Sequence, residues 1–264
     1  MSSNTFNFNR FGMLFKQHFI HNNKLLMYSS VAYVGVIFIL LTIVQMGQDR
    51  VPHDVEMFRG FLIGFVVVFG ILYAGYSFPA LRSKESTINY LMVPASVLEK
   101  FLFELVSRLG VTFILLPILF WITFHLQGYF FDLFTELSFR PIGFAEVVDF
   151  QVPDQIRDSA FWFVTLISSL IMLGFVLPFT GGAMFMKQPL VKTLFSVAII
   201  VIFYAGCVYI ALEPLGVAKY NPNDTMWLIP SNEKGAFRFF GSAVVLTNLV
   251  MLFVAFRKLK EREV

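Results

Sequence analysis

The chain has 264 residues, of which 57% are hydrophobic and only 14% are charged, and its formal net charge at pH 7 is +3. Soluble domains carry about a quarter charged residues, so this composition excludes an ordinary soluble protein. The length leaves room for one membrane domain with short loops but not for a second soluble domain. The small net charge gives no reason to expect nucleic-acid binding.

Six long apolar runs follow one another along the chain. They are residues 25–46, 58–81, 106–126, 161–180, 194–212 and 237–256. Each has about 19–24 residues, which is enough to cross a hydrocarbon core about 30 Å thick as a helix. None contains Lys, Asp or Glu, and Arg is found only within two residues of a run's end. The sequence therefore predicts an all-α polytopic membrane protein whose residues 1–264 form a single transmembrane domain with six transmembrane helices.

The segment before the first run, residues 1–24, has a pattern of its own. Phe8, Phe11 and Phe15 recur at helical spacing, and basic residues such as Lys16 lie between the apolar positions. This pattern predicts an N-terminal amphipathic helix that lies in the membrane interface. A short disordered basic lead is the alternative.

The basic residues are distributed unevenly between the two sides of the predicted membrane domain. If both termini are cytoplasmic, 13 of the 20 Lys and Arg residues lie inside, whereas 12 of the 17 acidic residues lie outside. The seven basic residues outside are Arg50, Arg59, Arg140, Arg157, Lys219, Lys234 and Arg238. The positive-inside rule therefore predicts cytoplasmic N- and C-termini in a multi-pass protein of the cell (cytoplasmic or inner) membrane. The basic inner face suits anionic membrane lipids.

Two outer segments differ from the spans. Residues 127–159 mix aromatic and acidic side chains and are too charged to span, so we expect them at the outer interface or in a small cap. Residues 213–235 contain Pro214, Pro222 and Pro230. Prolines in that number predict an irregular loop.

The cytoplasmic segment 82–105 contains two helical stretches separated by Pro94. A proline disfavours helical geometry at the residue before it, so the first stretch should end near Val93. Ser96 and Glu99 then have the spacing of a capping box, which starts a second helix. The sequence therefore predicts a short helix at 84–92 beneath the membrane, followed by a second helix that continues into the third span.

This segment resembles the cytoplasmic loop between spans two and three of type-2 ATP-binding-cassette (ABC) exporter permeases. The residues that match the family pattern are Glu85, Thr87, Leu91, Met92, Pro94, Ser96, Glu99 and Lys100. The local match covers about 25 residues, and the six-span topology and amphipathic start resemble the family over the whole chain. Three features depart from it: Ser86 stands where Gly is common, the spacing from Thr87 to Pro94 is about one residue short, and residues 213–235 are too polar for the apolar re-entrant hairpin of many relatives.

The resemblance implies the membrane permease subunit of an ABC exporter, which forms the translocation path as a homodimer or with a related permease subunit. The short helix would be the coupling helix that docks on a separate ABC ATPase subunit. The residues implied in ATPase coupling are Lys84, Glu85, Thr87, Ile88, Leu91, Met92, Pro94 and Glu99. ATP and Mg would be bound by the partner ATPase, with no cofactor in this chain.

The motifs of several enzyme classes are missing from the sequence. It contains no G-x-x-x-x-G-K-[ST] phosphate loop and no H-E-x-x-H pair, and its four His have no metal-ligand spacing. We therefore expect neither an enzyme nor a metal protein. No run has a carboxylate near its middle, which argues against a cation-coupled carrier. The alternative function is a non-transporting membrane scaffold or sensor that binds another cytoplasmic partner.

A few polar residues lie inside the predicted spans. Those considered for the translocation path or for interhelical contacts are Asn248, Ser168, Ser169 and Tyr204. Asn248 is the most costly because it lies near the middle of the sixth run. We expect it to find a partner on another helix, a contact worth about 0.6–2 kcal/mol in a membrane. Contact with a substrate is the alternative role.

Overall fold

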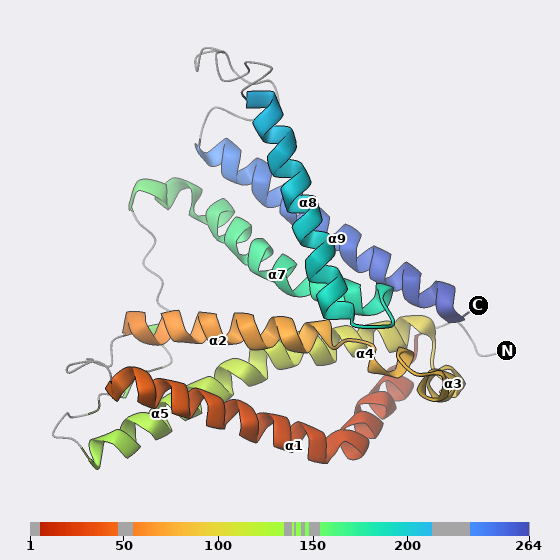
Figure 1. The fold of residues 1–264 in the computed structure, drawn as a ribbon, viewed down its shortest axis with the longest axis horizontal. Helices are drawn as coiled ribbons and strands as arrows, with labels where there is room; N and C mark the ends of the chain where they lie inside the picture. Colours follow the sequence, from red (N-terminus) through yellow and green to blue (C-terminus); the bar gives the residue numbers. More distant parts are fainter. Residues whose placement is uncertain are drawn as a thin grey trace. The chain divides into compact units, whose positions relative to one another are not determined.

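The computed structural model describes residues 6–46, 55–134, 139, 141–143, 146–147, 154–212 and 233–263. Over these ranges all regular structure is helical, and six helical stretches are long and apolar enough to cross a membrane. The chain is therefore an all-α, multi-pass membrane protein, as the apolar runs predicted. Figure 1 shows these helices along the chain.

The chain packs as two compact units. The first comprises Met1–Tyr73 with Met92–Gln151, and the second comprises Ala74–Leu91 with Val152–Val264. The first unit contains α1 (Phe8–Met46), most of α2 (Val55–Gly75), α4 (Val97–Gly110), a π-helical turn (Val111–Leu115) and α5 (Leu116–Asp132). The second contains α3 (Lys84–Met92, apart from its last residue), η3 (Asp154–Ser159), α7 (Ala160–Met184), α8 (Pro189–Leu212) and α9 (Glu233–Glu263).

The first helix differs from the prediction, because it has no break between an interfacial helix and a span. We expected an interfacial helix within residues 1–24 and a separate span at 25–46, but α1 is one continuous helix, Phe8–Met46. Residues 8–46 contain no proline, so the backbone hydrogen bonds continue through the predicted boundary. Figure 1 shows that α1 bends part-way along its length, and its first part runs in a different direction from the rest.

α4 leads directly into the third apolar run. Val97–Asp132 form one continuous helical stretch, which confirms that the second helix predicted in segment 82–105 continues into the third run. The capping box is also confirmed: Glu99 N donates to Ser96 Oγ (3.2 Å) and Ser96 N donates to Glu99 Oε2 (2.8 Å). The π-helical turn precedes Pro117, which lacks the N–H that would bond the carbonyl four residues earlier.

An aromatic core holds the first unit together. Its buried residues are Tyr33, Ile37, Leu41, Phe58, Leu116, Phe120, Phe124, Ile142 and Val147. Phe58 packs edge-on against Phe124 with ring centroids 4.7 Å apart, a favoured aromatic geometry. Two residues of the 127–159 segment, Ile142 and Val147, belong to this core, and Arg59 on α2 donates to the Val147 carbonyl (3.1 Å). These described residues of the segment therefore pack into the core of the first unit.

In the second unit, α7 and α9 pack along each other. Gly241 on α9 lies beside the α7 backbone, where a Cβ would make an ordinary van der Waals contact of 3.6 Å with the Trp162 carbonyl oxygen. Asn248 Nδ2 on α9 donates to the Ser169 carbonyl on α7 (2.9 Å), which confirms that Asn248 bonds to another helix. The irregular loop expected at 213–235 lies outside the described residues up to position 232.

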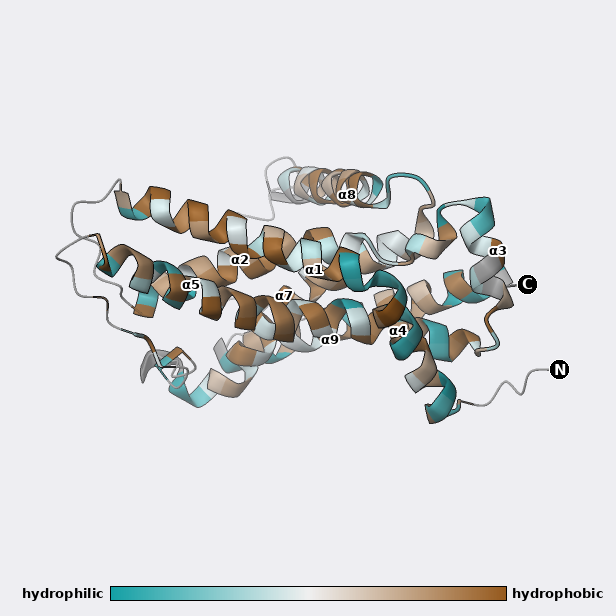
Figure 2. Cartoon of the chain, turned by 90° about the horizontal axis from the view of Figure 1, so that it is seen from below, coloured by the Kyte–Doolittle hydropathy of each residue, from teal (hydrophilic) through white to brown (hydrophobic). Residues whose placement is uncertain are grey.

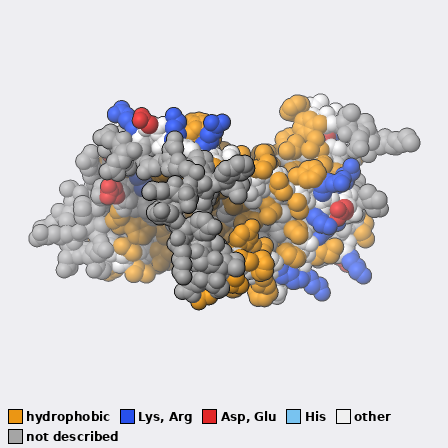
Figure 3. All heavy atoms as spheres, turned by 90° about the horizontal axis from the view of Figure 1, so that it is seen from above, with side chains coloured by type: hydrophobic (Ala, Val, Ile, Leu, Met, Phe, Trp, Pro, Cys, Tyr) orange, Lys and Arg blue, Asp and Glu red, His pale blue; other side chains and the backbone are white. Residues whose placement is uncertain are grey.

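Exposed apolar side chains cover much of the helices. On α8, Ile202 is 70% exposed and Phe203 is 69% exposed. Figure 2 shows hydrophobic residues along most of the helix lengths, and Figure 3 shows broad hydrophobic areas on one face with only small groups of Lys and Arg. Soluble monomers rarely expose so much apolar surface to water, whereas contact with lipid or with another membrane subunit accounts for it.

Candidate functional site

A short strap, residues 76–83, joins the end of α2 to α3. The second span was predicted to reach residue 81, and this end is wrong because α2 stops at Gly75. Phe78 adopts the left-handed conformation (φ 51°, ψ 49°), and Pro79 begins a short 3-10 turn, Pro79–Leu81. Proline disfavours helix at the preceding residue, so the α-helix cannot run through Phe78. A non-glycine residue held in this conformation requires support from its surroundings.

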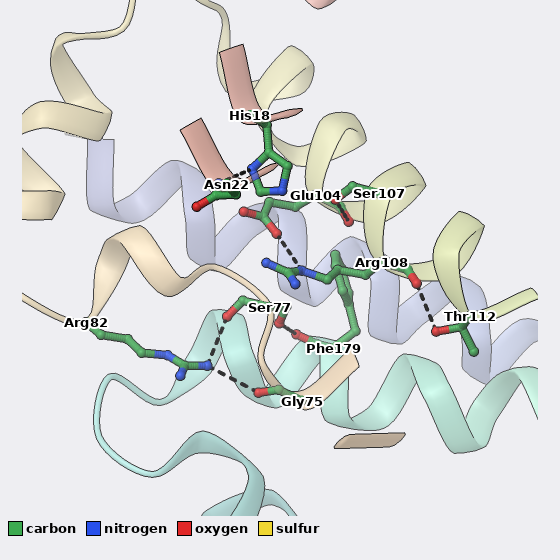
Figure 4. A network of polar contacts seen from close by, with 10 residues as sticks. All are labelled: His18, Asn22, Gly75, Ser77, Arg82, Glu104, Ser107, Arg108, Thr112 and Phe179. Carbon is green, nitrogen blue, oxygen red and sulfur yellow. Dashed lines mark hydrogen bonds and ion pairs between the residues drawn. The ribbon is translucent and has the colours of Figure 1, made fainter. Parts of the chain in front are cut away.

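Buried contacts with α7 provide that support. Ser77 Oγ donates to the Phe179 carbonyl (2.9 Å), and the Phe78 and Phe179 rings pack with centroids 5.2 Å apart (Figure 4 shows the Ser77 bond). All three residues are buried. Gly182 lies one turn further on, where a Cβ would clash with Ser77 Oγ and come within 3.1 Å of the Ser77 carbonyl oxygen. The strap is therefore fixed to the end of α7.

The strap also holds the start of α3. Arg82 Nη2 donates to the carbonyls of Gly75 and Ser77, each at 3.4 Å (Figure 4), and its guanidinium lies 4.0 Å from the centre of the Tyr76 ring. Thr87 Oγ1 bonds to the Ser83 carbonyl at 2.7 Å, with the Ala80 carbonyl 3.2 Å away. These bonds connect the first turn of α3 to the strap.

The structure places α3 at Lys84–Met92, the bounds predicted from the sequence. Lys84, Glu85 and Pro94 are exposed, and Thr87 is half-buried with its hydroxyl bonded to the backbone. Ile88 is 57% exposed and Met92 is 77% exposed. These two residues are four positions apart, so they share one face of the helix. The side chain of Leu91, which the sequence paired with Ile88, lies outside the described set.

The start of α4 holds the start of α1 through Glu99. Glu99 Oε1 accepts bonds from Asn7 N (2.7 Å) and Arg10 Nη2 (3.0 Å), while Oε2 accepts from Ser96 N (2.8 Å). The Glu99 carboxylate is completely buried. Glu99 was among the expected coupling residues, but it lies inside the first unit, where it positions two helices. We call these contacts, with those of His18 and Phe103 below, the clasp.

One turn along α4, the clasp continues through aromatic rings and a buried ion pair. The rings of Phe15 and His18 pack against Phe103, with centroids 4.9 Å and 5.2 Å away. Arg108 Nε donates to Glu104 Oε2 (3.2 Å), and both side chains are 5% exposed (Figure 4). Because the two charges are paired, Arg108 can lie near the start of the third span.

Of the polar residues considered for the spans, the structure brings two together. Asn248 and Ser169 meet between α7 and α9, and the buried Asn248 Oδ1 has no hydrogen bond in the described part of the chain. Ser168 is exposed, and Tyr204 on α8 is 68% exposed. The residues that the sequence did not single out are Ser77, Phe78, Phe179 and Gly182. Their only signal was Pro79 near the end of an apolar run.

The described residues contain no group of three or more His, Cys, Asp or Glu side chains that could hold a metal ion. Comparisons with protein-family models, with curated proteins and with solved structures find no match for the chain. The interpretation of its function therefore rests on its own geometry. The chain is a multi-pass helical membrane protein with an exposed short helix whose strap is fixed to α7.

Proposed function

We propose that this chain is the membrane permease subunit of an ABC exporter and that α3 couples it to a separate ATPase subunit. One observation carries the proposal: α3 exposes Ile88 and Met92 on one face while its strap is fixed to α7 by buried contacts. Exposed apolar anchors on a small helix are the type of residue that dominates a protein interface. A firm attachment to a span is what a mechanical coupling element needs.

The attachment supports transmission of movement from a partner to the spans. A force on α3 would reach Phe179 through Ser77 and Phe78, because all three are buried and in direct contact. Closely packed interiors transmit such strain without absorbing it. From α7 the movement would pass to α9, which packs along it. In this proposal ATP and Mg are bound by the partner ATPase, and two permease subunits form the translocation path.

The proposed orientation places both termini and α3 in the cytoplasm of the cell. We therefore expect a thiol reagent that cannot cross the membrane to label Asp158→Cys, but not Lys84→Cys, from outside intact cells. Both positions are exposed, and the test uses a Cys207→Ser background because Cys207 is the only cysteine. Permeabilised cells provide the control, since both cysteines should then react. Labelling of Lys84→Cys in intact cells would contradict the orientation.

The energy supply gives the direct test of the function. We expect the isolated chain neither to bind nor to hydrolyse ATP, and we expect it to co-purify from its own cells with a subunit that contains a phosphate-loop motif. Replacing the phosphate-loop Lys of that subunit by Ala should abolish hydrolysis by the complex. Hydrolysis by the chain alone, or purification that never yields such an ATPase, would overturn the proposal in favour of another membrane role.

A further inference from the structure

The first part of α1 has an outward face that takes no part in the clasp. This face consists of Met13, Lys16, Gln17, Ile20, Lys24 and Met27, which recur three or four residues apart and are all exposed. Met13 is 67% exposed and Ile20 is 69% exposed. The clasp residues Phe15 and His18 lie on another side of the helix, where they contact Phe103. The outward face therefore combines large apolar side chains with basic ones on a free side of α1.

Two adjoining hollows lie on α1 and share Ile20. The first, of about 400 Å³, is lined by Met13, Lys16, Gln17, Ile20 and His21. The second, of about 530 Å³, is lined by Phe19, Ile20, Asn23, Leu26, Met27 and Ser30. The first thus offers a cationic amine with an amide and an imidazole, whereas the second is mainly apolar.

The charge of this region is entirely basic. Residues 8–46 contain no Asp or Glu. The Arg10 guanidinium is bonded to Glu99, but Lys16 and Lys24 are exposed and form no ion pair within the described residues. Lys24 comes immediately before residue 25, where the apolar run of the first span begins, and Lys16 lies eight positions before Lys24. Lipid phosphates lie just beyond the hydrocarbon core, so a lipid beside the start of this run would bring its phosphate to these lysines.

We propose that the outward face of α1 binds one anionic phospholipid. Lys16, with Gln17 and His21, would contact its phosphate, Lys24 would add charge, and the acyl chains would lie along Phe19, Leu26 and Met27. A lipid fits better than a soluble protein partner, because the exposed apolar surface continues along the span at Val31, which is 64% exposed. A partner in the cytoplasm cannot follow that surface into the membrane. The inference does not depend on an ATPase.

The test uses the full chain in nanodiscs of phosphatidylcholine with and without phosphatidylglycerol. Native mass spectrometry after gentle release reports how strongly each lipid is retained. A Lys near an anionic membrane surface contributes about fivefold to binding, so Lys16→Gln with Lys24→Gln should weaken retention of phosphatidylglycerol about 25-fold. The matched control, Lys234→Gln with Lys260→Gln, removes two other exposed lysines and should retain the preference. Lys16→Arg with Lys24→Arg should also retain it.

Each contrary result overturns the proposal. No preference for phosphatidylglycerol in the wild-type chain would exclude the site, as would a full preference in the Lys16→Gln, Lys24→Gln variant. If glycerol phosphate competes as well as the whole lipid, the face binds a free phosphate and the apolar hollow has no role. If the Gln variant loses an ATPase partner but keeps its lipid preference, the face binds protein. Equal melting temperatures in pure phosphatidylcholine establish that the variants are folded.

Discussion

Replacing Ile88 and Met92 together by Asp should weaken association with the ATPase subunit at least 100-fold while leaving the membrane domain folded. The two side chains are 57% and 77% exposed, so their loss removes little packing within the chain. In an interface, a buried apolar anchor contributes about 2 kcal/mol or more, and placing a carboxylate there adds a cost of desolvation. Because the two residues lie four positions apart on α3, a single partner surface can cover both.

Pull-down at matched expression, followed by titration of the purified ATPase, measures this loss. Met186→Asp is the matched control, because Met186 is 55% exposed and lies in the short link between α7 and α8, on the same predicted side. Glu85→Lys should give a milder loss of affinity, since an exposed charge at the edge of an interface affects the association rate more than the equilibrium affinity. Undiminished binding by the Ile88→Asp, Met92→Asp variant would show that α3 is not the coupling element.

The bounds of α3 and the start of α4 could be predicted because their causes are local. Pro94 excludes helical geometry at Val93, and Ser96 and Glu99 satisfy each other's backbone N–H groups within one turn. A hydrogen bond from Asn248 to another helix could be predicted, since a buried amide in a membrane must find a hydrogen-bond partner. Its identity, the Ser169 carbonyl, needed the packing of α7 against α9.

The remaining features depend on residues far apart in the sequence. Glu99 was predicted as a cap, yet Asn7 and Arg10, about 90 positions earlier, also donate to it and make it completely buried. The bond from Ser77 to Phe179 spans 102 positions, and neither residue belongs to a pattern of its own. Hydropathy alone extended the second span to residue 81, because Phe78 and Leu81 are apolar although they are buried by protein.

Glu99→Ala should release the start of α1 and cost about 3 kcal/mol of stability. The substitution leaves the N–H groups of Ser96 and Asn7 without this acceptor and removes the ion pair between Glu99 and the Arg10 guanidinium. Buried donors without an acceptor cost about 1–3 kcal/mol each, and loss of one member of a buried ion pair costs about 3–5 kcal/mol. The lower end applies here because Arg10 is 26% exposed and can turn to water. Faster hydrogen exchange over residues 7–18 and a lower melting temperature measure the effect.

Two comparisons separate the role of the Glu99 carboxylate in capping from its role in the ion pair. Arg10→Ala should cost about 1 kcal/mol or less, since solvent screens this partly exposed charge and the two backbone bonds to Glu99 remain. Glu85→Ala, which removes an exposed carboxylate from the first turn of α3, should stay within about 0.5 kcal/mol of the wild type. If Arg10→Ala instead equals Glu99→Ala, the ion pair holds the clasp and the backbone acceptors contribute little. The buried position of Glu99 favours the opposite order, because its capping bond to the N–H of Ser96 is buried and water cannot replace it.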